Sequence, residues 1–363
     1  MKILQVITGL GVGGAERVVC DLSDTLLSKG DDVKIIYLYG DAKLKPREKI
    51  NIEKVDIRNP LSAIINLVKI VRSYNPDIVH GHMFHANIIV RFLKLVFPKL
   101  TVINTAHSGN EGGILRMYLY RSTNRLISLF TNVSKGAVEE FVKKGAVKKG
   151  GMIPLANGIN INKFRHDGVF CEKVRELHQL DCDSFLIVSV GSLREAKGFD
   201  LAIKSAESLK NNHNIKFKWL IIGDGPLREY LEELVNTSSL QDVVSLIGNK
   251  DNVNEYYSAS DLFVSTSRWE GFGLVIAEAI ASELPVVSTE TSGAKEIIFD
   301  KRYLSKIDDV KDLSSNIISA LFMTKCERAK YIKYNRDYVL ENYSMDKYCD
   351  SWRELYLKVT HDS

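Results

Sequence analysis

The sequence predicts an α/β protein built from two doubly wound parallel-sheet domains. Short apolar segments alternate with amphipathic segments of roughly 10 to 15 residues, which is typical of parallel strands joined by helices. The alternation runs from the N-terminus to about residue 107 and starts again at residue 185, after a Pro-, Gly- and Asn-containing stretch at 153–164. The 363 residues also exceed what one ordinary core holds. We therefore expect one domain at 1–165 and a second at 166–341.

The elements follow from the apolar runs and the segments between them. In the first domain we expect strands at 2–8, 33–39, 77–82 and 101–107, and helices at 15–29, 61–74 and 85–95. In the second we expect strands at 185–191, 217–223, 243–248, 262–267 and 284–289, and helices at 199–210 and 226–234, the latter with Pro226 at its first position. We expect a C-terminal helix, about 342–360, to pack back on the first domain. Because such sheets bind ligands beyond the carboxyl ends of their strands, the two domains should face one cleft.

The charge is divided unevenly along the chain. Up to residue 165 there are 25 Lys and Arg against 13 Asp and Glu, a net charge of +12; the remainder has 24 against 32, a net charge of −8. The basic half is expected either to meet anionic lipid or an anionic acceptor, or to carry ordinary solvated faces. The sequence contains no apolar run of 18 residues, so no membrane-spanning helix is expected. The N-terminus lacks the pattern of a signal peptide. Five scattered cysteines without a Cys-x-x-Cys pair predict a reducing, cytoplasmic location without structural zinc.

The first candidate site is the glycine-rich stretch GLGVGG at 9–14, between a strand and a helix. Gly9, Gly11 and Gly14 match the G-x-G-x-x-G dinucleotide pattern. A glycine turn before a helix brings backbone N–H groups close to an anion. A dinucleotide-binding site also requires an acidic residue about 20 residues after the glycines. Asp41, which is 27 residues beyond Gly14, is a poor match to this spacing. The stretch therefore leaves three interpretations open: a nicotinamide cofactor, the diphosphate of a nucleotide sugar, or a tight turn that only packs the helix.

The second candidate site is the loop VGSLREAKG at 190–198, which follows the first strand of the second domain. Arg194 and Lys197 would face the cleft there. The planar guanidinium and the compact ammonium could neutralise a diphosphate, although the loop alone could equally be a solvated one.

The third candidate site is SRWEGFGLVIAE at 267–278. Glu270 and Glu278 flank a bend whose backbone N–H groups, from Gly271, Phe272, Gly273 and Leu274, lie at a helix start. Carboxylates accept hydrogen bonds from sugar hydroxyls, and the amides can bind phosphate. This combination suits a sugar nucleotide.

Glu270 and Glu278, with GFGL after the first and LPVV after the second, resemble the retaining glycosyltransferases of group 4. Those enzymes have the GT-B fold, and many of them build bacterial surface polysaccharides. The resemblance covers essentially the whole chain. Further segments match the family in the same order: GGAE (13–16), DIVHGH (77–82), NTAHSG (104–109), VSKGAVEEF (133–141), LANGIN (155–160), GSLREAKG (191–198), IGDGPLREYLEEL (222–234), YYSASDLFVSTSRWEGFG (256–273) and TSGAKEII (291–298).

The resemblance implies transfer of a sugar, with retention and without a metal or other cofactor, from a nucleotide diphosphate donor to an acceptor hydroxyl. UDP is favoured over GDP by family resemblance alone. His107 and Glu270 would then contact and orient the donor sugar, Glu278 would hold the ribose, and Lys197, Arg194 and the amides of 271–274 would stabilise the departing diphosphate. Gly13 and Gly14 would contact that diphosphate from the first domain.

Two positions depart from the family pattern. Ser192 stands where many members carry arginine, which makes Arg194 the nearest replacement, and Glu283 stands where many carry glycine.

The acceptor is expected on the first domain, as a glycan or lipid-linked glycan of O-antigen, capsule or exopolysaccharide synthesis; no nucleic acid is expected. The segment 112–126 is apolar and aromatic and carries Arg116, Arg121 and Arg125, and lysines follow at 143, 144, 148 and 149. It would either dock on anionic lipid at the inner face of the cytoplasmic membrane or pack as an ordinary helix. Two other classes remain: a nicotinamide-dependent enzyme acting on sugar nucleotides, and a catalytically silent nucleotide-sugar-binding protein.

Overall fold

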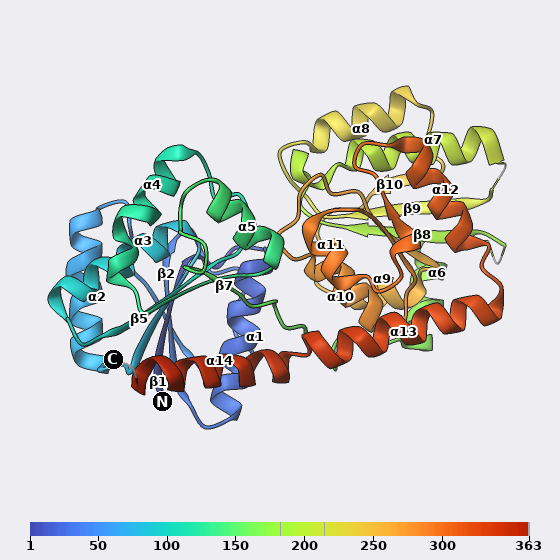
Figure 1. Ribbon diagram of the computed structural model, residues 1–363. Coiled ribbons are helices and arrows are strands. Elements are labelled where there is room, and N and C mark those ends of the chain that lie inside the picture. Colours follow the sequence, from blue (N-terminus) through green and yellow to red (C-terminus); the bar gives the residue numbers. More distant parts are fainter. Residues whose placement is uncertain (182, 214, 362–363) are drawn as a thin grey trace. The chain divides into compact units, whose positions relative to one another are not determined.

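The computed structural model describes residues 1–181, 183–213 and 215–361, and the chain divides into two compact units (Figure 1). The first comprises Met1–Ile159 with Tyr343–Ser363, and the second comprises Asn160–Asn342. The expected boundary lay at residue 165. The observed one falls earlier because the connecting segment packs with the second unit, where the ring of Phe164 lies 6.0 Å from that of Tyr257.

The first unit is built around a parallel sheet with helices on both faces. Its strand order is β3-β2-β1-β4-β5-β6-β7. The strands are β1 (Lys2–Gly9), β2 (Asp32–Tyr39), β3 (Asn51–Lys54), β4 (Ile78–His82), β5 (Thr101–Ala106), β6 (Leu129–Asn132) and β7 (Ile153–Pro154). The helices are α1 (Gly14–Ser28), α2 (Pro60–Tyr74), α3 (Phe84–Val96), α4 (Ile114–Thr123), the 3-10 turn η1 (Asn124–Leu126), α5 (Lys135–Lys143) and α14 (Met345–His361).

Alternation along the strands gives this sheet two buried faces. Leu4 and Val6 of β1 pack with apolar residues of α2 and α3, while Ile7 packs with Val19 of α1 on the other face. The C-terminal helix α14 contacts α1 (Figure 1) and buries Trp352, whose ring lies 4.4 Å from that of His80. The sheet is therefore covered on both sides, as a parallel sheet requires.

The second unit repeats the arrangement, with strand order β10-β9-β8-β11-β12-β13, all parallel. Its strands are β8 (Phe185–Val190), β9 (Phe217–Ile222), β10 (Val244–Leu246), β11 (Leu262–Ser265), β12 (Val286–Thr289) and β13 (Leu304–Ser305). Its helices are α6 (Gly168–Leu177), η2 (Glu195–Lys197), α7 (Phe199–His213), α8 (Arg228–Thr237), α9 (Val253–Ala259), α10 (Leu274–Ala281), α11 (Ser292–Ile297), η3 (Lys301–Tyr303), α12 (Val310–Leu321) and α13 (Lys325–Tyr343). Trp219 is fully buried in the core of this unit.

Every strand and helix expected from the sequence is present, with shifts of a few residues at the ends. Pro226 is an exception in detail, because it lies in a turn and α8 begins at Arg228. Of the cysteines, Cys182 lies outside the described residues, and the four described ones are free thiols. Within the described ranges, no helix combines the length and apolar character needed to cross a membrane.

Candidate active site

Each sheet changes its strand order beside its first strand. In the first unit β1 pairs with β2 on one side and β4 on the other, and in the second unit β8 lies between β9 and β11. At such a switch point the strand-to-helix loops diverge and open a crevice at the carboxyl ends of the strands. The glycine loop follows β1, and the loops that carry Lys197 and Glu270 follow β8 and β11. The topology thus places the predicted site residues where such sheets bind ligands.

The glycine loop of the first unit closes on a carboxylate from its own helix. Gly13 is the N-cap of α1, with an extended backbone at φ −159°, and a Cβ at this position would overlap the Glu16 carboxylate. Burial raises the pKa of Glu16, against a hydrogen bond from its own backbone amide that favours the charged form. A carboxylate therefore lies beside the helix start at which Gly13 and Gly14 were expected to bind phosphate. Glu16 was not among the predicted site residues.

His107 follows β5 and is held by a second histidine. His82 Nε2 lies 2.7 Å from Gln5 Oε1, and His82 Nδ1 lies 3.1 Å from His107 Nε2. An amide oxygen only accepts, so His82 Nε2 carries the proton and His82 Nδ1 accepts from His107 Nε2–H. This leaves His107 Nδ1 as an acceptor, and it is buried without a hydrogen-bond partner among the described residues.

Both histidines are neutral at physiological pH. Burial lowers the pKa of His107 to about 4 and lowers the pKa of His82 well below its usual value. Their rings lie 5.3 Å apart between centroids, and that of His80 lies 4.0 Å from that of His82. A neutral imidazole is better suited to forming a hydrogen bond with a sugar hydroxyl than to donating a proton in the reaction. His82 was not predicted as a site residue, although its place at the end of β4 was a usable signal.

In the second unit the structure brings Lys197 and Glu270 together. Lys197 Nζ and Glu270 Oε2 form a close ion pair, and Ser267 Oγ donates to the same oxygen at 3.1 Å. Both charged side chains are largely buried, at 20% and 16% exposure. The two loops are locked together because Gly198, at φ +59°, packs against the carbonyl of Thr266, where a Cβ would overlap the oxygen. The predicted phosphate-binding lysine is therefore paired with the predicted sugar-binding acid.

The neighbouring Arg268 anchors this loop rather than facing a ligand. Its Nη2 and Nη1 donate to the two oxygens of Asp200 at 2.7 and 2.9 Å, and its Nε donates to Asp308 at 2.8 Å. This bidentate pair fixes the direction in which the chain enters Glu270.

The remaining predicted donor residues surround the start of α10. Gly273 adopts φ +97° as its N-cap, a conformation that favours glycine. Leu274 begins the helix, and Glu278 lies within it, 9% exposed and 3.4 Å from the Tyr257 hydroxyl. The Phe272 side chain is buried in the core, and the prediction for this residue concerned its backbone N–H alone.

Two sequence-family models match the chain. The Glycosyltransferase Family 4 model matches residues 12–163, and the Glycosyl transferases group 1 model matches residues 172–338. Between them they cover most of both units, in the order that the motifs predicted. The chain belongs to the family 4 glycosyltransferases.

Relatives and solved structures agree with this assignment. The glycosyltransferase is 25% identical over 317 residues to the amylovoran biosynthesis glycosyltransferase AmsD of Erwinia amylovora, covering 84% of this chain and 85% of AmsD. It is 25% identical over 326 residues to the UDP-Gal:alpha-D-GlcNAc-diphosphoundecaprenol alpha-1,3-galactosyltransferase of Escherichia coli, covering 84% and 81%. The crystal structure of Anabaena HepE with UDP and glucose matches at a TM-score of 0.87 and 16% identity, over 99% and 100% of the chains. The fold is therefore GT-B, as predicted.

The two departures from the family pattern have different outcomes. Glu283 adopts φ +62°, which explains why glycine is common there, and its carboxylate lies 3.5 Å from Arg336 Nε. Ser192 and Arg194 are both exposed, and the Arg194 side chain forms no hydrogen bond or ion pair among the described residues. Arg194 is thus free to meet a ligand, whereas Lys197 already has a partner.

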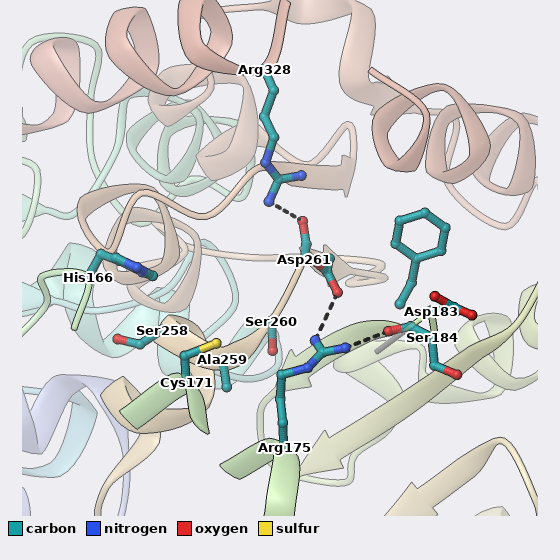
Figure 2. A pocket seen from close by; sticks show the side chains of 11 residues that line it. His166, Cys171, Arg175, Asp183, Ser184, Ser258, Ala259, Ser260, Asp261 and Arg328 are labelled. Carbon is teal, nitrogen blue, oxygen red and sulfur yellow. Dashed lines mark hydrogen bonds and ion pairs between the residues drawn. The ribbon is translucent and has the colours of Figure 1, made fainter. Parts of the chain in front are cut away.

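A cavity of about 520 Å³ lies at the opposite end of the second unit's sheet (Figure 2). Its lining includes Phe185, the first residue of β8, and Asp261, which directly precedes β11, so it lies away from the loops that carry Lys197 and Glu270. Figure 2 shows Arg175 and Arg328 pointing toward Asp261 from opposite sides. Arg175 Nη1 lies 3.4 Å from the Asp261 carboxylate, and Arg328 Nη2 donates to the backbone carbonyl of Asp261 at 2.9 Å. These arginines fasten α6 and α13 to the sheet and do not belong to the candidate active site.

Proposed function

We propose that this glycosyltransferase transfers a sugar, with retention and without a metal, from a nucleotide diphosphate donor, UDP before GDP, to a glycan or lipid-linked glycan acceptor. The observation that carries the proposal is the Lys197–Glu270 pair at the switch point of the second sheet, with Glu278 on the helix that follows. One cation for phosphate and two acids for hydroxyls are the groups that such a donor requires.

Each of these residues has a role that its surroundings support. Lys197 balances the charge that develops on the departing diphosphate, with Arg194 as an exposed second cation. Glu270 accepts hydrogen bonds from the donor sugar, and Glu278 accepts them from the ribose. His107 offers an imidazole lone pair to the sugar near the reacting carbon, and Gly13 and Gly14 contact the diphosphate through their backbone N–H groups.

Relatives support the class of donor and acceptor. HepE has been solved with UDP and glucose, and the Escherichia coli relative is named for UDP-Gal and a diphosphoundecaprenol acceptor. AmsD is named for amylovoran biosynthesis. These names support a role in surface polysaccharide synthesis, and we propose that the enzyme acts there; the cytoplasmic location stays a prediction from its scattered cysteines. The alternative of a nicotinamide-dependent enzyme rested only on the first fourteen residues, and the family assignment does not support it. The alternative of a protein that binds a nucleotide sugar without transferring it is tested by the experiment below.

Ligand-dependent melting and a transfer assay test the proposal together. We expect UDP or GDP to raise the melting temperature in the presence of EDTA, because a nucleotide bound only to the folded state stabilises it. We also expect one UDP- or GDP-sugar to be consumed with release of the nucleotide. Stabilisation by NAD but by neither nucleotide would contradict the proposal, and nucleotide binding without transfer or slow donor hydrolysis would indicate a silent protein.

The acceptor side of the proposal is supported by helix α4. Ile114, Leu115 and Tyr118 are exposed on it at 88%, 70% and 65%, next to the exposed Arg121 and Arg125. Apolar side chains beside cations suit docking on anionic lipid, where a lipid-linked acceptor would be found.

Arg116 does not belong to this surface. It turns inward, where its guanidinium lies 4.5 Å from the ring of Phe84 and its Nη1 donates to the Glu111 carbonyl at 2.9 Å. The expectation that all three arginines serve one surface is therefore corrected to two.

Flotation with anionic vesicles tests the docking surface. We expect the wild type to float and the Ile114→Ser/Leu115→Ser/Arg121→Ala/Arg125→Ala variant to stay at the bottom of the gradient, because apolar burial and charge attraction are both lost. The variant Lys330→Ala/Lys333→Ala is a control, since it removes two exposed cations from the second unit. Equal flotation of wild type and the α4 variant would show that α4 is an ordinary surface helix.

A further inference from the structure

A carboxylate lies between the His107 loop and helix α4. Glu111 Oε1 accepts from the His107 backbone N–H at 3.1 Å, and Oε2 accepts from the Tyr120 hydroxyl of α4 at 2.5 Å. The Glu111 carboxyl forms no ion pair among the described residues, although Arg116 and Arg91 are close enough to favour its charge. Glu111 is half-buried, and a carboxyl held by two hydrogen bonds without an ion pair, with a pKa raised by burial, is a candidate for a functional role.

The helix that Glu111 contacts is itself firmly held. Arg91 is fully buried in α3, and its Nη1 donates to the Tyr120 carbonyl and the Thr123 hydroxyl at 2.8 Å each. Its guanidinium also lies 4.9 Å from the Tyr120 ring. Asn87 Nδ2 donates to the Tyr120 hydroxyl at 3.2 Å. Tyr120 therefore cannot move without breaking several contacts, and Glu111 connects the His107 loop to this fixed point.

We infer that Glu111 is a positioning residue for His107. Glu111 fixes the backbone of His107 while His82 fixes the ring, so the imidazole has one orientation before substrate binds. Such preorganisation counts in transfer, since a displacement of about 1 Å at a reacting group can cost about 100-fold in rate. The inference rests on the proposed function only in assigning His107 to the reaction.

The experiment compares Glu111→Ala, Glu111→Gln and the control Glu139→Ala, an exposed acid on α5. Glutamine keeps the carbonyl oxygen that accepts from His107 N–H. We expect Glu111→Ala to lower kcat about 10- to 100-fold with the donor KM within about 3-fold of wild type. We expect Glu111→Gln to stay within about 3-fold in both constants, and the nucleotide affinity to be unchanged in every variant. A kcat near wild type in Glu111→Ala, or equal damage in both variants, would overturn the inference.

Hydrogen–deuterium exchange of residues 107–113 tests the same point without turnover. Exchange there should accelerate in Glu111→Ala and not in Glu111→Gln or Glu139→Ala; unchanged exchange in Glu111→Ala would overturn the inference. If the wild type transferred no sugar from any donor, the proposed function would fail while this measurement still decided the role of Glu111.

The stability of the Gln variant provides a further readout. Burial raises the pKa of Glu111 to about 7, opposed by the hydrogen bond from Tyr120. The Glu111 carboxyl therefore binds its proton more tightly in the folded protein than in the unfolded chain. Protonation of Glu111 stabilises the fold fully below the unfolded pKa, and this stabilisation is lost as the pH rises through the folded pKa of about 7. The groups facing the carboxyl are Tyr120, Arg116, Arg91 and the His107 amide. Glu111→Gln should therefore melt higher than wild type at pH 8, and a lower melting temperature there would contradict the raised pKa of Glu111.

Discussion

Replacing Lys197 with methionine is expected to lower sugar transfer about 100- to 1,000-fold and to abolish most of the stabilisation by UDP. The ammonium is the partly buried cation at the switch point of the second sheet, and its methylene stem packs beside Gly191. Removing one preorganised group that stabilises developing charge typically costs a factor of this size. Methionine keeps the stem, so the loss reports on charge. The transfer rate and the UDP-dependent shift in melting temperature are the measurements.

Lys204→Met provides the matched control for this variant. Lys204 lies on α7, is half-exposed and pairs weakly with Asp200 at 3.9 Å. It should leave both readouts near wild type. A Lys197→Met enzyme that bound UDP and transferred sugar as well as the control would remove Lys197 from the site and shift the phosphate contacts to Arg194 and the backbone amides.

The fold was open to prediction because parallel α/β chains carry their pattern locally. Each apolar run of the second unit, such as FLIVSVG and FKWLIIG, became a strand at its expected place. The strand order was not readable, since nothing local says that β4 rather than β3 lies beside β1. The short elements β7 and β13, of two residues each, leave no periodic trace.

Site residues were predictable where glycines and charged residues lie together in a loop after a strand. They were not predictable where the role of a residue depends on which side chains enclose it in the folded protein. Lys197 and Glu270 are 73 residues apart in sequence, yet both follow strands that meet at the switch point. Glu111 lies in a loop that reads as an ordinary polar turn, and its importance appears only when Tyr120 and the His107 amide are seen to enclose it. Glu16 likewise reads as a helix acid until it is found over Gly13.

Replacing Glu270 with glutamine is expected to separate binding from transfer. In the ligand-free enzyme Glu270 neutralises Lys197, so the diphosphate must compete with a carboxylate for the ammonium. Glutamine has nearly the same shape without the charge, and Ser267 Oγ can still donate to its oxygen. We expect UDP to bind about 3- to 10-fold more tightly, while transfer falls about 10- to 100-fold because charge-assisted hydrogen bonds to the sugar are lost.

The double variant Lys197→Met/Glu270→Gln identifies the cause. If Glu270 weakens UDP binding only through Lys197, the tighter binding should vanish once the lysine is absent, which is a non-additive pair. Calorimetric titration with UDP measures all four proteins of this cycle. Tighter binding that persists without Lys197 would mean that Glu270 repels the diphosphate directly. Weaker binding in Glu270→Gln alone would show that the ion pair holds Lys197 in its binding position, so that the carboxylate assists the phosphate site instead of competing with it.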